Sequence, residues 1–150
     1  ETHGKRYIIM RLPSVLGNDP KAGPRKNAVE YLLAQIKRGE DVNVYSGDCY
    51  RTYLHADDVA RAMHTIMTKG EENTVYNVGS GESHRLYDIL QYAIGRTGSK
   101  SRINLVAAPR FHQVVQVPDF HFDTTKLRGL GFVPDMDAYQ AVERVLAQLP

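Results

Sequence analysis

The stretch Asn-Val-Tyr-Ser-Gly-Asp-Cys-Tyr-Arg-Thr-Tyr-Leu-His-Ala-Asp-Asp-Val-Ala-Arg-Ala-Met, residues 43–63, decides the fold of this chain. It begins within a predicted half-buried strand, because Val42 and Val44 alternate with polar neighbours, and residues 47–48 form a Gly-Asp turn. Arg51 follows this turn and lies between two predicted elements. A guanidinium held in this way suits a phosphate or carboxylate, since its donors match two acceptor oxygens at once.

A helix is predicted to follow Arg51, with Asp57 or Asp58 as its cap. Its apolar residues recur at helical spacing and predict one buried face, made of Val59, Ala62, Met63, Ile66 and Met67. His55 precedes the helix. We expect this histidine to pack at the end of a strand and donate a hydrogen bond to the backbone, a structural rather than a catalytic role.

The same stretch resembles part of the extended short-chain dehydrogenases/reductases, a family of NAD(P)-dependent nucleotide-sugar epimerases, dehydratases and reductases. The family pattern joins an aromatic strand end, a glycine turn, an arginine and a His-x-Asp-Asp helix start. This chain fills the pattern with Tyr45, Gly47, Asp48, Arg51, Tyr53, His55, Asp57, Asp58, Val59 and Ala62. Its turn is shorter than is usual in the family, and Ser46 replaces the first glycine.

A second match to the family lies toward the C-terminus. It consists of Pro109, Arg110, Asp123, Lys126, Leu130, Gly131, Phe132 and Pro134. The resemblance implies that Arg110 binds the nucleotide together with an aspartate three residues later. Gln113 takes the place of that aspartate here, which puts the ribose contact in doubt and leaves the identity of the sugar nucleotide open.

A third match covers residues 11–17, where the family carries Arg-x-x-Asn-x-Tyr-Gly. Ser14 takes the place of the asparagine and Leu16 that of the tyrosine. The resemblance implies that Pro13 and Ser14 approach the nicotinamide of the cofactor and that Ser14 also approaches the sugar. The full set of expected substrate contacts is Arg51, Arg110, Tyr45, Asn43, Gln113 and Ser14. Tyr45 could stack on a base or lie in the core of the protein.

The rest of the chain alternates predicted strands and amphipathic helices, as α/β proteins do. Strands are predicted at residues 7–12, 74–78, 103–107 and 114–117, and helices from Val29 to Gly39, after a Ser83 cap, from Asp123 to Gly131 and after an Asp137 cap. The glycine turn at residues 79–83 is either a plain turn or a phosphate cradle at a helix N-terminus. We predict an α/β fold that contains the last strands of a Rossmann-type sheet plus a small mixed α/β substrate-binding lobe.

Composition excludes several classes of protein. The chain has 150 residues, of which 42% are hydrophobic and 24% charged, as in one ordinary globular domain. A net charge of +2 from scattered basic residues does not indicate nucleic-acid binding. No apolar run approaches the roughly 20 residues of a membrane span. The densest basic cluster, Lys21, Arg25 and Lys26, is either a solvated loop or a patch for an anionic ligand.

Cysteine and histidine usage indicates neither a disulfide nor a metal site. Cys49 is the only cysteine, so no internal disulfide can form, and this fits a reducing cytoplasm. The histidines lack the spacing of metal ligands, and we expect no metal.

The chemistry of the family requires a Tyr-x-x-x-Lys pair, and none of the nine tyrosines here has a lysine four positions later. The glycine fingerprint for the dinucleotide is also missing. We therefore interpret residues 1–150 as the C-terminal, substrate-binding part of a longer enzyme, with no catalytic residue of its own. The parent would use NAD or NADP on a nucleotide-diphosphate sugar. This chain alone is expected to bind neither cofactor and to form a cytoplasmic homodimer.

The sequence also allows a second function, a non-catalytic sugar-nucleotide-binding or regulatory module of the same fold. It does not distinguish an epimerase from a dehydratase or a reductase, or NAD from NADP.

Overall fold

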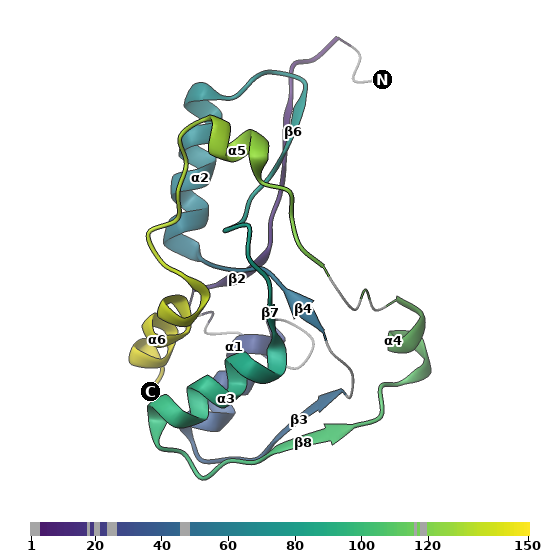
Figure 1. Ribbon diagram of the computed structural model, residues 1–150, viewed down its shortest axis with the longest axis vertical. Helices are drawn as coiled ribbons and strands as arrows, with labels where there is room; N and C mark the ends of the chain where they lie inside the picture. The colour runs from purple at the N-terminus through teal and green to yellow at the C-terminus, as the bar shows by residue number, and fades with distance from the viewer. Residues whose placement is uncertain are drawn as a thin grey trace.

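The computed structural model describes residues 4–17, 19, 22–23, 27–45, 49–115, 117 and 120–150. The turn predicted at residues 47–48 and the basic cluster of Lys21, Arg25 and Lys26 lie outside these residues. The described chain is elongated, with an upper part around α2 and a lower part around α1 and α3 (Figure 1).

The strands are short and pair two by two. They are β1 (Ile8–Arg11), β2 (Ser14–Leu16), β3 (Val42–Tyr45), β4 (Tyr50–Arg51), β5 (Tyr53–His55), β6 (Thr74–Asn77), β7 (His84–Arg85) and β8 (Ile103–Val106). The pairs β1–β6, β2–β5 and β3–β8 are parallel, whereas β4 and β7 are antiparallel. The predicted parallel arrangement is therefore confirmed for three of the four pairs among the described residues.

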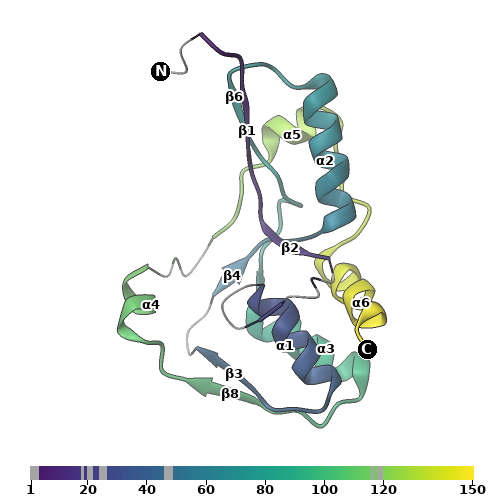
Figure 2. The ribbon, with the colours of Figure 1, turned by 180° about the vertical axis from the view of Figure 1, so that it is seen from behind.

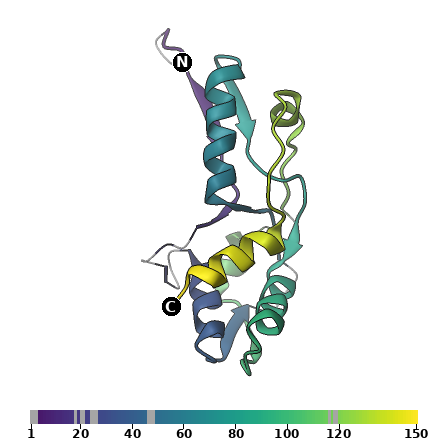
Figure 3. The ribbon, with the colours of Figure 1, turned by 90° about the vertical axis from the view of Figure 1, so that its left-hand side faces the viewer.

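The helices separate these strands along the chain. They are α1 (Ala28–Lys37), α2 (Ala56–Lys69), α3 (Leu86–Thr97), α4 (Arg110–Val115), α5 (Thr125–Gly129) and α6 (Ala138–Gln148). Seen from behind, α1 and α3 lie above the β3–β8 pair (Figure 2), and a side view shows α6 between the upper and lower parts (Figure 3). Parallel strands with helices between them are the α/β fold class that the sequence predicts.

Two apolar cores hold the structure together. The lower core gathers side chains of α1, α3 and α6, including Leu33, Ile89 and Val142, which are fully buried. The upper core joins α2, β6 and α5 through side chains such as Ile66 and Leu127. Burying side chains of this kind stabilises a fold by about 1.5–3 kcal/mol each.

The helix that follows Asp137 is confirmed together with its cap. The Asp137 carboxylate accepts from the backbone N–H of Gln140, while the Gln140 side chain accepts from the backbone N–H of Asp137. This reciprocal arrangement is a capping box, a signal contained within four consecutive residues.

The predicted caps of the other two long helices are wrong. The N-cap of α2 is His55, whose Nδ1 accepts from the backbone N–H of Asp57. His55 is buried at the end of β5 as expected, but it accepts this hydrogen bond rather than donating one. Ser83 does not cap α3 either, because β7 intervenes and α3 begins at Leu86. The glycine turn before Ser83 consequently does not open directly on a helix N-terminus.

Asp58 does not cap α2; its side chain binds a segment that is distant in sequence. Its buried carboxylate accepts from the backbone N–H groups of Asp135 and Met136, at 2.9 and 3.1 Å, and from Arg61. These contacts tie the start of α2 to the turn that leads into α6.

The structure also corrects other predictions of burial and of secondary structure. Residues 110–115 form α4 rather than part of a strand, since Pro109 favours a helix start and Gln113 N–H bonds to the Pro109 carbonyl. Met63 and Met67 are 38% and 73% exposed, so only part of the predicted α2 face is buried. The strand β1 is half exposed, with Ile9 at 48%, because helices cover one face of the β1–β6 pair.

No helix in the described part of the chain is both long enough and apolar enough to cross a membrane.

Candidate functional site

A hollow of about 310 Å³ lies where the end of β1 meets β4. It is lined by Leu12, Pro13, Ser14, Arg51, Thr52, Val117 and Phe120. The β2–β5 pairing creates this meeting point, because the backbone N–H of Ser14 donates to the Thr52 carbonyl at 3.0 Å. Three residues predicted from two separate stretches, Pro13, Ser14 and Arg51, thus line one hollow.

The Arg51 guanidinium is held by backbone carbonyls. Its Nη1 donates to the Tyr50 carbonyl at 2.6 Å and to the Val117 carbonyl at 2.7 Å. Among the described residues, no carboxylate pairs with Arg51. Within the described part of the chain, its positive charge is therefore available to an anion.

Thr52 is a lining residue that the sequence analysis missed. It is 1% exposed, and its Oγ1 has no hydrogen-bond partner among the described residues. A buried hydroxyl without a partner is costly, and a polar ligand group in the hollow would satisfy it. Its position directly after Arg51 is the only signal in the sequence that could have identified it.

Tyr53, which follows Thr52, points the other way and belongs to the lower core. Burial raises the pKa of its phenol well above the ordinary value, so this tyrosine stays protonated at neutral pH.

A second hollow, of about 360 Å³, lies between α1 and the β3–β8 pair. Its lining includes Tyr31, Asn43, Tyr45, Leu86 and Val106. Tyr45 is 39% exposed, and its ring lies 4.8 Å from that of His112 on α4. Tyr45 is therefore not a core residue, and the alternative, a surface for a flat ring such as a base, stays open.

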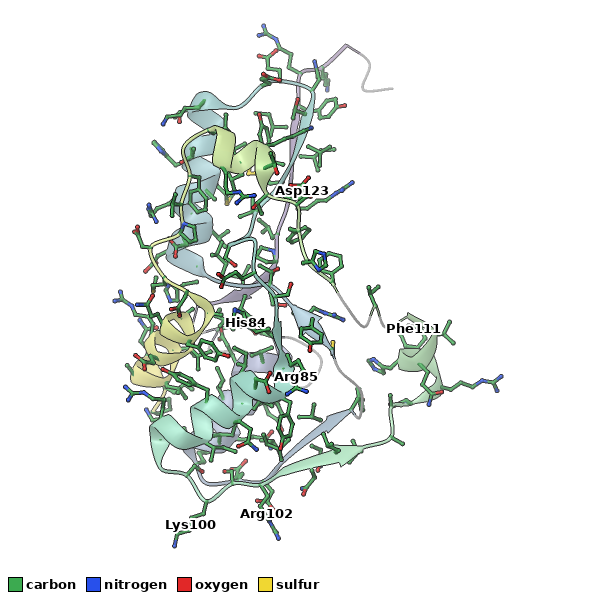
Figure 4. The ribbon with its side chains drawn as sticks, viewed as in Figure 1. His84, Arg85, Lys100, Arg102, Phe111 and Asp123 are labelled. Carbon is green, nitrogen blue, oxygen red and sulfur yellow. The ribbon has the colours of Figure 1, made fainter. Side chains whose placement is uncertain are left out.

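The structure does not bring the remaining predicted residues into either hollow. Arg110 is the exposed first residue of α4, a helix at the side of the molecule on which Phe111 is labelled (Figure 4). The Gln113 side chain turns back and donates to the Ala108 carbonyl at 2.6 Å. The expected contacts of Arg110 and Gln113 with the substrate remain predictions.

Comparison with known proteins identifies the family. A model of the NAD dependent epimerase/dehydratase family matches residues 1–79, more than half of the chain. The chain belongs to this family. A putative UDP-glucose 4-epimerase of Methanocaldococcus jannaschii is 26% identical over 149 residues, which are 96% of this chain and 46% of that protein. A dTDP-glucose 4,6-dehydratase of Streptomyces niveus is 27% identical over 89% of this chain and 38% of its own length.

Solved structures confirm the α/β fold class of this epimerase/dehydratase chain. A UDP-glucose 4-epimerase of Thermotoga maritima, solved with UDP-glucose, superposes with a TM-score of 0.84 at 24% identity, over 97% of this chain and 46% of that one. A UDP-glucose 4-epimerase of Thermus thermophilus, solved with NAD, gives 0.82 at 20% identity, over 97% and 47%. The chain thus spans about half the length of the relatives that it matches.

The described chain has no built cradle for the dinucleotide that the family name implies. Such a cradle joins a strand, a glycine-rich turn and the N-terminus of a helix. The turn at Gly79 and Gly81 follows β6, but it leads into β7. This turn therefore does not form such a cradle.

Proposed function

We propose that this chain is the C-terminal, nucleotide-sugar-binding part of an NAD(P)-dependent epimerase or dehydratase, as the resemblance of its sequence implies. The observation that carries the proposal is the hollow that collects Pro13, Ser14 and Arg51, an arginine that pairs with no carboxylate among the described residues. Membership of the epimerase/dehydratase family supports it.

The two hollows suggest where each part of a nucleotide sugar would bind. The Arg51 guanidinium offers donors to a diphosphate bearing about two negative charges, while the Thr52 hydroxyl accepts or donates beside it. The nucleobase would occupy the second hollow against Tyr45, with Asn43 at its rim. Arg110 and Gln113, on α4, would approach the ligand from the side on which His112 contacts Tyr45.

The chain is proposed to bind and orient the sugar without completing the reaction. No Tyr-x-x-x-Lys pair exists in the sequence, so the acid/base group and the cofactor would come from a dinucleotide-binding part. The second candidate, a non-catalytic sugar-nucleotide module, is favoured by one observation: Gln113 replaces the expected aspartate, and its side chain donates to the Ala108 carbonyl just before α4. NAD(P)-dependent turnover by the full reading frame would exclude that candidate. A cytoplasmic location is proposed on the single free cysteine alone.

Calorimetric titration tests the proposal. We expect UDP-glucose or dTDP-glucose to bind the 150-residue chain saturably, whereas NAD and NADP do not bind, because the described residues form no dinucleotide cradle. Cofactor binding tighter than about 100 μM, which is about −5.5 kcal/mol, would contradict the interpretation as a substrate-binding part.

Self-association is a further expectation. One edge of β1 is unpaired among the described strands, and Ile9 and Leu12 beside it are 48% and 46% exposed. Because such edges pair with other chains, we expect homodimers in light scattering, and Ile9→Lys should shift them to monomers. Met67→Lys, at an equally apolar but distant exposed position on α2, is the matched control. A purely monomeric wild-type chain at millimolar concentration would exclude pairing through this edge.

A further inference from the structure

Three side chains from different elements hold one segment by its carbonyl groups. The contacts are Arg51 to the Val117 carbonyl at 2.7 Å, Ser83 to the Phe120 carbonyl at 3.1 Å and Asn77 to the Asp123 carbonyl at 3.0 Å. We call Val117 and residues 120–123 the strap. Its attached carbonyls recur every three residues, so the strap is fastened at both ends and once between them.

The strap side chains nearest Arg51 are only partly buried. Val117 and Phe120 are 49% and 39% exposed, although both line the hollow. Phe120 contacts Phe122 edge-on, with the ring centroids 5.0 Å apart, and the strap lies beside β6 at Asp123 (Figure 4). The hydrogen bonds to its carbonyls therefore help to hold the strap beside Arg51.

These hydrogen bonds determine which edge of the Arg51 guanidinium is free. Nη1 is engaged by the carbonyls of Tyr50 and Val117, whereas Nε and Nη2 have no partner among the described residues. Nε and Nη2 form one of the edges through which a guanidinium binds two oxygens at once. A guanidinium already fixed by two carbonyls loses less freedom when an anion binds.

We propose that Ser83 and Asn77 are positioning residues for Arg51. By fastening the strap, they place the Val117 carbonyl so that it orients the guanidinium toward an anion such as a diphosphate. Neither residue is among those that line the hollow, so they act through the strap rather than by contact with the ligand. The inference rests on the proposed function, in which Arg51 binds the diphosphate.

Substitution of Ser83 tests this role, with UDP as the probe. Ser83→Ala should raise the Kd of UDP roughly three- to tenfold, the effect of losing one neutral hydrogen bond. Ser83→Thr keeps the hydroxyl and should restore most of the affinity. Ser80→Ala is the matched control, because the Ser80 hydroxyl bonds only within its own loop, to Glu82. Urea unfolding of each variant checks that the fold is retained.

A double-mutant cycle separates positioning from a general structural role. In the Arg51→Ala background, Ser83→Ala should have no further effect on the Kd of UDP, because its influence passes through the missing guanidinium. Asn77→Ala should behave in the same way. Additive losses, or a Kd unchanged by Ser83→Ala, would overturn the positioning role while leaving the proposed function intact. Failure of the wild-type chain to bind UDP would instead overturn the proposed function, and this inference with it.

Discussion

Replacing Asp58 with alanine is expected to destabilise the fold by about 2–4 kcal/mol, because two partly buried backbone N–H groups lose their acceptor and Arg61 loses its partner. For a chain of this length, that loss lowers the melting temperature by roughly 5–15 °C. Asp58→Asn should fall between the wild type and Asp58→Ala, since one of its two side-chain acceptors is kept. Urea denaturation followed by circular dichroism measures the change.

Asp57→Ala is the matched control for this prediction. Asp57 is the neighbouring carboxylate in the same first turn of α2, but its side chain is 62% exposed and its ion pair with Arg144 is 3.8 Å long. Its removal should change stability by less than about 0.5 kcal/mol. Equal losses for the two variants would show that Asp58 acts through the helix terminus after all.

Replacing Arg51 with alanine is expected to weaken nucleotide-sugar binding by about 2–4 kcal/mol, roughly 30- to 1,000-fold in Kd, because the diphosphate loses a charged bidentate partner. Arg51→Lys should recover only part of this loss, because an ammonium cannot reproduce the guanidinium fork. Calorimetric titration of UDP-glucose and dTDP-glucose into the wild type and both variants measures the effect.

A control variant must show that Arg51→Ala acts by removing a contact with the ligand and not merely by removing one positive charge. Arg38→Ala removes an arginine that pairs with Glu40 on the surface and lines neither hollow, so it should leave the Kd unchanged. If Arg51→Ala binds as tightly as Arg38→Ala, Arg51 does not contact the ligand and only fastens the strap.

The elements that were predicted correctly are mostly indicated by residues close together in the sequence. The Asp137–Gln140 capping box and the apolar spacing of α3 are each contained within a few residues, so they can be recognised without knowledge of the rest of the chain. The same is true of the glycine at position 39, which has a φ of 76° just after α1 and marks the end of that helix.

Predictions failed where contacts distant in sequence decide the structure. Ser83 was expected to cap a helix, but pairing of the adjacent β7 with β4 separates it from α3. Asp58 looked like a cap, yet its oxygens bind N–H groups 77 and 78 residues away. A single sequence contains no signal for either contact, because each depends on how separate elements pack.

The candidate site was predictable only in part for the same reason. Family resemblance pointed to Pro13, Ser14 and Arg51, which the structure places around one hollow. It did not point to Thr52 or Val117, because their roles depend on the β2–β5 pairing and on the path of the strap. It also grouped Arg110 with Arg51, whereas the structure places Arg110 on α4 and outside both hollows.

The most direct test of the account is to map UDP-glucose onto the chain by NMR, following the backbone amide signals and the Arg51 Nε signal during a titration. The account predicts saturable shifts at Ser14, Thr52, Val117 and the Arg51 side chain, with a second group at Asn43 and Tyr45. Shifts confined to other surfaces, or no shifts at millimolar UDP-glucose, would contradict the proposal that this chain binds the nucleotide sugar.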